Sequence, residues 1–240
     1  MKVHILIAII LNLFTACNQD KKIGDVVSIR VMDKSYPCQY DNPVVSLGIG
    51  LVIAGPIVEI YNDSLLTSKL DSFDMYTIDE NTKINICSKY YKPDYGIMHF
   101  VCLKEHNNCF KVLVNYSTIY YLPKTKDNTF KTWEAYILDA HGISRVTDEE
   151  IVLPQPLRKK PAVQSDTLII PNGLEMFCPI EIKGDWVKVK YDCFYNLNEN
   201  PYEGEPCHEF INKCKNPVTG WLQWKSNNKI LFIKQKIGKK

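Results

Sequence analysis

The chain has 240 residues, of which 29 are basic, 27 are acidic and nine are cysteine, and its formal net charge is +2. Such an even balance excludes a typical nucleic-acid binder, which carries a clustered basic surface to neutralise phosphates. A transmembrane helix needs about twenty uninterrupted apolar residues, and the most apolar segment after the N-terminus, residues 44–60, contains three glycines and a proline. We therefore expect neither a nucleic-acid partner nor a membrane-spanning helix.

The N-terminus has the pattern of an export signal. Lys2 provides a basic start, residues 5–14 form an apolar run broken only by Asn12, and small residues lead into Cys17. A run of about ten residues is too short to span a bilayer, so it predicts a cleaved signal peptide over residues 1–16. We expect residues 17–24 to follow as a tether.

Thr15-Ala16-Cys17 resembles the lipobox of bacterial lipoproteins, although Phe14 stands where that family usually has Leu. The resemblance implies cleavage before Cys17, a lipidated thiol there, and a membrane as partner through the acyl chains. An ordinary secretory signal, in which Cys17 is only another thiol, is the alternative. Both interpretations place the protein outside the cytoplasm.

Short segments rich in β-branched and aromatic residues predict an all-β fold. Helix signals are scarce, because no segment sustains apolar residues at helical spacing between a cap and a glycine stop. We expect one β domain over residues 25–147. The clearest predicted strands of the chain are residues 26–31, 57–61, 83–87, 98–103, 110–115 and 186–191.

A proline-rich linker is predicted over residues 148–162. This stretch contains three prolines, with acidic residues before them and basic residues among them. Prolines hold a chain extended and prevent regular structure, as an interdomain connection requires. A long connection within one domain is the alternative.

Residues 163–236 predict a small β-barrel. Lys183-Gly184-Asp185 indicates a hairpin turn, and residues 186–191 alternate so that Val187 and Val189 face the core. The Gly-Asp-Trp-Val-Lys-Val hairpin at residues 184–189 and the Gly-Trp-Leu at 220–222 resemble the bacterial SH3-like domain, a five-stranded barrel. Unlike that family, this chain inserts residues 194–218 before the Gly-Trp strand.

A similar but weaker pattern of strand, turn and aromatic residues occurs earlier in the chain. Strand residues 101–104, a turn at Asn107-Asn108 and residues 110–114 are followed by Trp133 and Tyr136, as the C-terminal hairpin is followed by Trp221 and Trp224. The similarity suggests a second SH3-like unit, so that two barrels would be joined by the linker. Hairpins also resemble one another through packing alone, which is the alternative.

The cysteines indicate disulfides. Eight remain after Cys17, and an even number in an exported chain permits complete pairing. Sequence cannot choose among about a hundred pairings, but the most local hypothesis joins two of Cys193, Cys207 and Cys214. The full set is Cys38, Cys87, Cys102, Cys109, Cys178, Cys193, Cys207 and Cys214.

The spacing of His99, Cys102, His106 and Cys109 is the nearest approach to a metal site, because zinc prefers such ligands. On a strand, however, His99 and Cys102 point to opposite faces. We therefore expect core or disulfide roles for these cysteines, surface roles for the histidines, and no metal or other cofactor.

Asp192-Cys193 invites comparison with papain-like cell-wall peptidases, which often carry SH3-like domains. Those enzymes have Asp-Cys-Ser-Gly at a helix start and a distant histidine, whereas here Phe194-Tyr195 follows and only His208 lies downstream. A thiolate nucleophile needs a positioned base. We expect no catalytic residues and no enzyme.

Aromatic side chains are the candidate ligand contacts: Trp186, Trp221, Trp224 and Tyr191. Aromatic faces form recognition platforms, although at least two of these residues are expected in the core. Trp224 is favoured as the exposed one, since it lies three residues from Trp221 and so on the opposite strand face.

Together these patterns predict a non-catalytic lipoprotein of the bacterial cell envelope. The SH3-like resemblance implies peptidoglycan or an envelope protein as ligand. One alternative is an inhibitor or immunity-type protein that contacts a partner enzyme or toxin through residues 194–218. Another is a cell-wall hydrolase.

Overall fold

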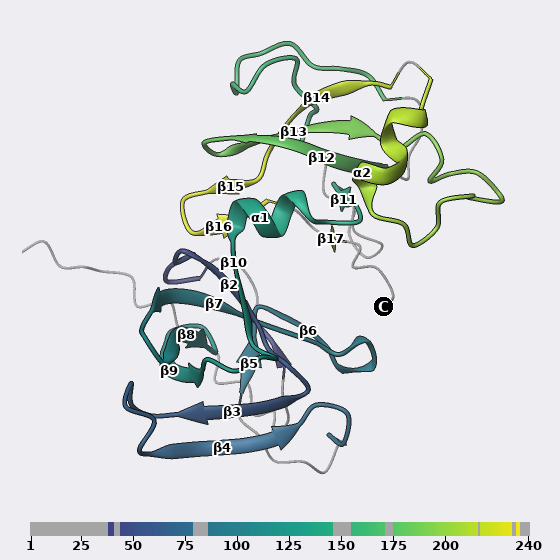
Figure 1. The fold of residues 1–240 in the computed structure, drawn as a ribbon. Coiled ribbons are helices and arrows are strands. Elements are labelled where there is room, and N and C mark those ends of the chain that lie inside the picture. The colour runs from purple at the N-terminus through teal and green to yellow at the C-terminus, as the bar shows by residue number, and fades with distance from the viewer. Residues whose placement is uncertain are drawn as a thin grey trace, which may run out of the picture. The chain divides into compact units, whose positions relative to one another are not determined.

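The computed structural model describes residues 38–40, 44–78, 86–145, 155–170, 175–215, 217–231 and 234–235. All of these residues belong to one compact unit, Asp33–Lys240, in which strands predominate and the helices are short (Figure 1). The predicted all-β fold class is therefore confirmed. The predicted signal peptide, Cys17, the tether and the strand at residues 26–31 lie outside the described residues.

The N-terminal half folds into an eight-stranded antiparallel sheet that curves as a half-barrel (Figure 1). The strand order is β10-β2-β7-β8-β9-β3-β4, and β6 pairs with β7. Separately, β1 and β5 form a short parallel pair. The bounds are β1 (Cys38–Gln39), β2 (Gly50–Ile53), β3 (Ile57–Tyr61), β4 (Lys69–Asp74), β5 (Cys87–Ser88), β6 (Tyr90–Lys92), the 3₁₀ turn η1 (Pro93–Tyr95), β7 (Ile97–Glu105), β8 (Cys109–Val114), β9 (Thr118–Pro123) and β10 (Thr129–Thr132).

Three of the strands predicted for this half fall on observed ones. Residues 57–61 are β3, and the predicted strands at 98–103 and 110–115 lie on β7 and β8, which are joined by the expected turn. Of the predicted strand 83–87, only residues 86–87 are described, and Cys87 begins β5.

A helix follows β10, in a stretch where the residue pattern predicts none. The helix α1 (Trp133–Leu138) is capped by Thr132, whose hydroxyl accepts a hydrogen bond from the Ala135 N–H at 3.2 Å. The expected strand positions for Trp133 and Tyr136 are therefore wrong. A helix of six residues contains too few turns for helical periodicity to be visible in the sequence.

The C-terminal half forms a second, five-stranded sheet with the order β14-β13-β12-β11-β17. The turn at Lys183-Gly184-Asp185 is as predicted, and Gly184 has φ +58°, a conformation that favours glycine. Val187 and Val189 face the core as expected. The bounds are β11 (Ile143–Ser144), β12 (Met176–Lys183), β13 (Trp186–Tyr191), α2 (Cys207–Phe210), η2 (Ile211–Lys213), β14 (Thr219–Gln223), β15 (Lys225–Ser226), β16 (Lys229–Ile230) and β17 (Lys234–Gln235).

Part of the predicted linker is packed against this sheet. Leu157 is fully buried, and the backbone of Arg158 bridges to Trp221 on one side and to Thr167 on the other. Arg158 thus extends the β14 edge of the sheet, because its backbone N–H and carbonyl are both paired with Trp221. Residues 148–154 of the predicted linker lie outside the described residues.

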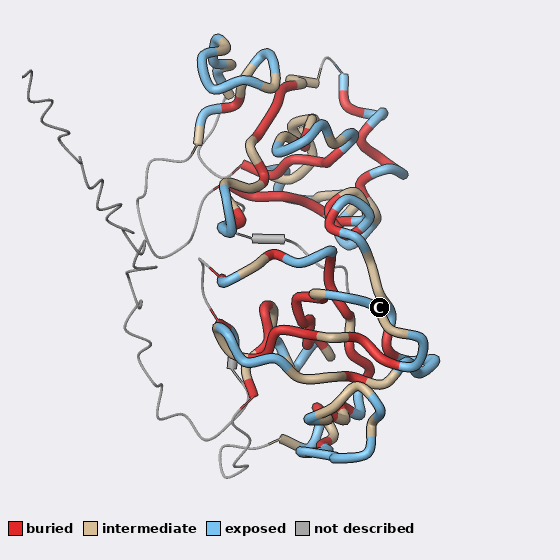
Figure 2. The backbone as a smooth tube through the Cα atoms, turned by 90° about the vertical axis from the view of Figure 1, so that its left-hand side faces the viewer, coloured by how far each residue is buried: buried red, intermediate tan, exposed pale blue. Residues whose placement is uncertain are grey.

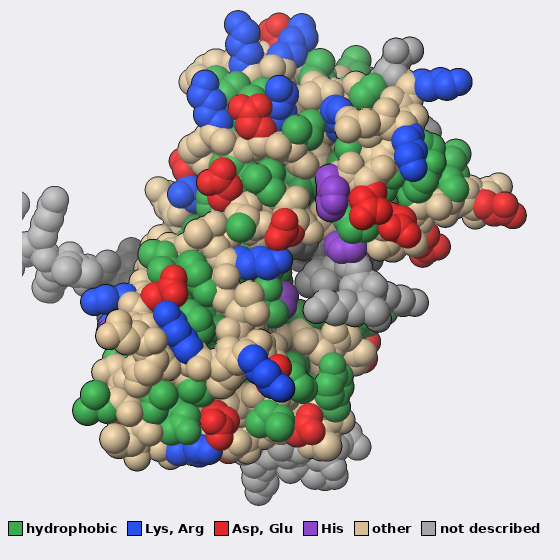
Figure 3. Space-filling view, in the orientation of Figure 1, with side chains coloured by type: hydrophobic (Ala, Val, Ile, Leu, Met, Phe, Trp, Pro, Cys, Tyr) green, Lys and Arg blue, Asp and Glu red, His purple; other side chains and the backbone are tan. Residues whose placement is uncertain are grey.

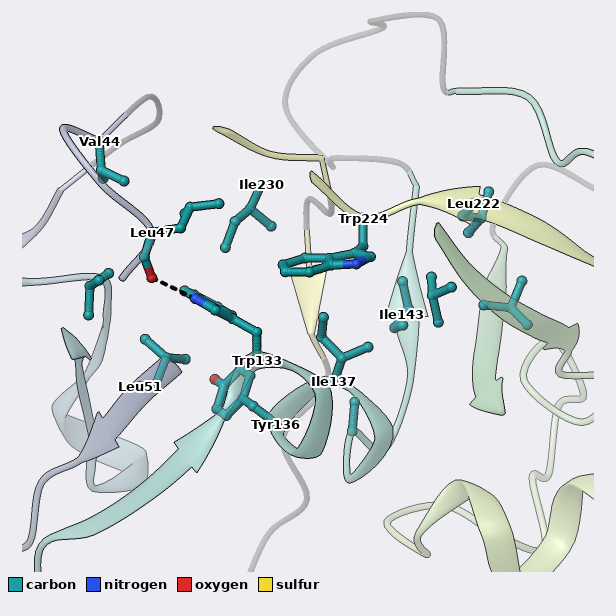
Figure 4. Packing of buried hydrophobic residues seen from close by; sticks show 14 of the residues in the cluster. Val44, Leu47, Leu51, Trp133, Tyr136, Ile137, Ile143, Leu222, Trp224 and Ile230 are labelled. Carbon is teal, nitrogen blue, oxygen red and sulfur yellow. Dashed lines mark hydrogen bonds between the residues drawn. The ribbon is translucent and has the colours of Figure 1, made fainter. Parts of the chain in front are cut away.

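The two sheets share one hydrophobic core, in which α1 lies between them (Figure 4). The indole N–H of Trp133 donates to the Leu47 carbonyl at 2.7 Å, and the Trp133 ring lies 6.1 Å from the Trp224 ring. A second core fills the half-barrel between its strands. Buried residues accordingly follow the strands in both halves, whereas connecting loops are exposed (Figure 2).

Candidate binding surface

The outer face of the C-terminal sheet carries alternating cationic and aromatic side chains. Val187 and Val189 of β13 point into the core, so Trp186, Lys188 and Lys190 point to the other face. On the neighbouring strand β14, Trp221 lies directly opposite Lys188. The outer face therefore consists of the alternate strand residues that point away from the core.

Four residues on adjacent strands form what we call the outer row: Glu181, Lys188, Trp221 and Arg158. Lys188 Nζ lies 5.8 Å from the centre of the Trp221 ring and 3.5 Å from a Glu181 carboxylate oxygen. The Arg158 guanidinium donates to the Ser165 carbonyl at 2.9 Å. With about 4.8 Å between strands, the row is roughly 14 Å long.

Trp186 extends the outer row on one side. It lies opposite Gln223 on β14 and Lys183 on β12, and its side chain is partly exposed. Basic side chains with carboxylates among them crowd the end of the molecule that carries β12–β14 (Figure 3). Cations beside indole rings suit a ligand that combines carboxylates with apolar faces, as an acidic peptide-bearing glycan does.

Trp221 and Trp224 lie on opposite strand faces, as predicted. The prediction that Trp224 is the exposed one is wrong, because Trp224 faces the core and Trp221 is on the outer face. Trp224 is 5% exposed, packs against Trp133, and donates its indole N–H to the Gly184 carbonyl at 2.9 Å. It shares its strand face with buried Leu222, so it belongs to the core. Trp221 is on the outer face, where Lys188 and Arg158 flank it and leave it 9% exposed.

Tyr191 connects the core with the insertion. Its ring contacts Phe177 with 6.0 Å between ring centres, and its hydroxyl accepts a hydrogen bond from Asn196 Nδ2 at 3.2 Å. This position makes Tyr191 a structural contact between β13 and residues 194–218. Trp186 and Tyr191 are thus the partly exposed members of the four predicted aromatic contacts, since Trp221 and Trp224 are buried.

The insertion folds over one end of the outer face and is held there by two disulfides. Cys193–Cys214 confirms the hypothesis that two of the three local cysteines pair. The third, Cys207, pairs with Cys178 on β12, a partner that lies too far away in the sequence to be inferred from spacing. Disulfides persist in oxidising compartments, so both bonds fit the extracytoplasmic location expected from the leader.

A small aromatic core supports the insertion. The rings of Tyr202 and Phe210 are stacked with centres 5.3 Å apart, Phe194 packs edge-on to Tyr202 at 4.8 Å, and Lys213 Nζ lies 4.4 Å from the Tyr202 ring centre. The insertion is therefore an ordered part of the surface beside the outer row.

The predicted histidine and cysteine constellation is dispersed. Cys102 and Cys109 are buried free thiols, as a core role requires, and burial raises the pKa of Cys102 to about 12. His99 is 5% exposed, so its expected surface position is wrong. In the described ranges, no three His, Cys, Asp or Glu side chains are grouped as metal ligands.

His99 is held in a pocket of aromatic residues. Its Nδ1 shares a 2.9 Å hydrogen bond with the Tyr136 hydroxyl, and the rings of Tyr90 and Tyr136 lie edge-on to it. Burial, with a smaller effect from the charge of Lys131, lowers the pKa of His99 to about 4. The imidazole is therefore neutral near pH 7.

The sulfur of Cys193 is occupied by the bond to Cys214, so it offers no thiolate for nucleophilic attack. The geometry that would make Asp192-Cys193 a peptidase motif is accordingly missing. Asp192 instead accepts a hydrogen bond from the Phe194 N–H at 2.9 Å, at the start of the insertion.

Sequence reasoning missed Arg158 and Lys188 as surface contacts. The alternation of β13 already placed Lys188 on the solvent face beside Trp186, so a search for cations next to the tryptophans would have found it. Arg158 gave no such signal, because its pairing with Trp221 joins residues far apart in the sequence.

Among the helices that the structure describes, none has the length and apolar character needed to cross a bilayer. Comparisons with protein-family models, with curated proteins and with solved structures found no match.

Proposed function

We propose that the protein is a non-catalytic lipoprotein of the bacterial cell envelope and that it binds peptidoglycan through the outer row and Trp186. The observation that carries the proposal is the placing of the partly exposed Trp186 and Lys188 on the outer side of β13, beside the largely buried Trp221 of β14. Peptidoglycan offers sugar faces for the Trp186 indole and peptide carboxylates for the cations.

The SH3-like resemblance supports this proposal. β12, β13 and β14 form an antiparallel meander in which the Gly-Asp-Trp hairpin pairs with the Gly-Trp strand, and Arg158 adds a further backbone bridge at the β14 edge. This arrangement is compatible with a small SH3-like barrel.

The binding test is co-sedimentation of the purified full-length protein with cell-wall sacculi. We expect binding that is lost in a Trp186→Ala/Lys188→Gln variant, because both the ring and the charge are removed from one face. Lys92→Gln, on the other half of the chain, is the matched control and should bind normally. Unchanged sedimentation of the double variant would contradict the proposal, and release of soluble muropeptides would favour a hydrolase.

The membrane anchor is tested separately. Lipid on Cys17 would hold the protein on a membrane, since each buried methylene contributes about 0.8 kcal/mol. We expect the parent protein to partition into detergent and a Cys17→Ser variant to remain in the aqueous phase. Aqueous partitioning of the parent would favour the ordinary secretory signal.

A second candidate function is that of an inhibitor or immunity-type protein. The insertion favours it, since two disulfides fix a surface loop that carries exposed Leu197 and four glutamates. Rigid loops bind with a smaller entropic loss. Capture of one defined envelope enzyme or toxin, without binding to sacculi, would favour this function over peptidoglycan binding.

A further inference from the structure

A second row of cations and aromatic rings crosses the N-terminal sheet. Its members are directly opposite one another on five neighbouring strands, from β4 through β3, β9 and β8 to β7. We call them the N-terminal row: Lys69, Tyr61, Tyr121, Lys111 and Lys104. At about 4.8 Å per strand, the row is roughly 19 Å long.

The end of the N-terminal row holds two like charges side by side. Lys104 and Lys111 are paired across β7 and β8 at a register shift, and like charges directly opposite in a sheet are destabilising. On the same face, Lys69 has a carboxylate partner in Glu59. Within the described ranges, neither Lys104 nor Lys111 forms an ion pair. A bound anion would relieve this repulsion.

The middle of the row is aromatic. Tyr61 and Tyr121 are partly exposed and opposite each other on β3 and β9. Lys69 Nζ lies 5.6 Å from the Tyr61 ring centre, and the His106 ring lies 6.0 Å from that of Tyr121. Two adjacent rings followed by two unpaired cations form a surface for apolar faces next to negative charge.

We propose that the N-terminal row binds a linear polyanionic glycan, with sugar faces against Tyr61 and Tyr121 and carboxylates at Lys104 and Lys111. Neighbouring strands are rotated by about 20°, so the row follows a twisted surface that a chain-like ligand can trace and a flat bilayer cannot. Two unpaired lysines also provide too few phosphate contacts for strong nucleic-acid binding. The site is on a different sheet from the outer row, so the two proposals can fail independently.

Titration of the purified full-length protein with polygalacturonate tests this inference, with uncharged dextran as the negative control. We expect binding that weakens with added salt and falls about tenfold in a Lys104→Gln/Lys111→Gln variant. A Lys159→Gln/Lys160→Gln variant removes two neighbouring lysines from the other half and should bind as the parent does. Tyr121→Leu should weaken binding, and Tyr121→Phe should retain it, because the ring face makes the contact.

The unliganded stability provides a second readout. Since the Lys104→Gln/Lys111→Gln variant loses a like-charge pair, its midpoint of thermal unfolding should equal or exceed that of the parent, so that weaker binding is not caused by misfolding. Equal loss of affinity in both double variants would overturn the inference, as would equal binding of uncharged dextran. Tighter binding to single-stranded DNA or to anionic vesicles would also overturn it.

Discussion

At the scale of single residues, His99 makes the fold sensitive to acid. Its pKa falls from 6.5 to about 4 in the folded state, mainly through burial, so the unfolded chain binds a proton more readily. The contribution of neutral His99 to the free energy of unfolding is therefore fully present above pH 6.5. It declines as the pH falls toward 4, by about 3 kcal/mol in total. Urea unfolding at pH 7 and pH 4.5 measures this loss.

His99→Gln provides the comparison, because an amide can still bond to the Tyr136 hydroxyl but does not titrate. We expect this variant to lose less stability than the parent between the two pH values. His208→Gln, on the exposed side of α2, should retain the full pH dependence. Parallel pH profiles for the parent and His99→Gln would show that other groups cause the acid sensitivity.

Arg145 and Glu175 form a buried ion pair beside β11 and β12. Arg145 Nε donates to a Glu175 carboxylate oxygen at 2.6 Å and its Nη1 donates to the Gln155 carbonyl at 2.7 Å. Arg145→Met leaves a buried carboxylate without its partner and should cost about 3–5 kcal/mol in urea unfolding. Lys159→Met breaks the exposed pair with Asp166 and should cost less than about 1 kcal/mol. Similar losses in both variants would contradict the argument.

The tryptophans show how far residue-level prediction reaches. Strand alternation correctly separated Trp221 from Trp224, because parity along a strand is a local property. It could not say which face was buried, since that depends on α1 bringing Trp133 against Trp224. The alternation of side chains along a strand can be inferred from the local sequence, but tertiary packing determines which element covers each face.

At the scale of elements, the insertion depends on its disulfides. Cys193–Cys214 and Cys178–Cys207 are interlaced along the chain. The first closes a separation of 21 residues, so a Cys193→Ser/Cys214→Ser variant should lose about 3 kcal/mol of stability. We also expect residues 194–206 to become the first site of limited proteolysis, as followed by mass spectrometry.

A Cys102→Ser variant is the control for this experiment, since it removes a thiol that forms no disulfide. Its insertion should resist proteolysis as the parent's does, whatever its effect on the N-terminal core. If the insertion of the Cys193→Ser/Cys214→Ser variant remains resistant, the remaining Cys178–Cys207 bond and the aromatic core around Tyr202 and Phe210 are sufficient to order it.

Hairpins were predictable as elements, whereas α1 and the segment at 155–170 were not. β7–β8 and β12–β13 have alternating strands with a short turn between them, so the whole signal is contained in about fifteen residues. By contrast, Leu157 and Arg158 are ordered by contacts with Gly220 and Trp221. Their prolines indicated a linker because the sequence does not reveal the distant strand edge.

At the scale of the whole molecule, the two sheets are joined by a common core. Trp133 and Tyr136 of α1 contact the N-terminal half, and Trp224 and Leu222 belong to the same cluster from the C-terminal sheet. Two barrels with separate cores would have been consistent with the hydrophobic pattern alone. Periodicity identifies which residues are buried but not which core they enter.

A shared core predicts that the molecule unfolds in one step. In urea, tryptophan fluorescence and far-UV circular dichroism should give coincident transitions, and Trp133→Ala should shift both together by about 3–5 kcal/mol. Tyr95→Ala removes a ring that is 52% exposed and should leave both transitions nearly unchanged. Two separate transitions in the parent, or a Trp133→Ala effect confined to one of them, would mean that the halves fold as the independent domains expected from the sequence.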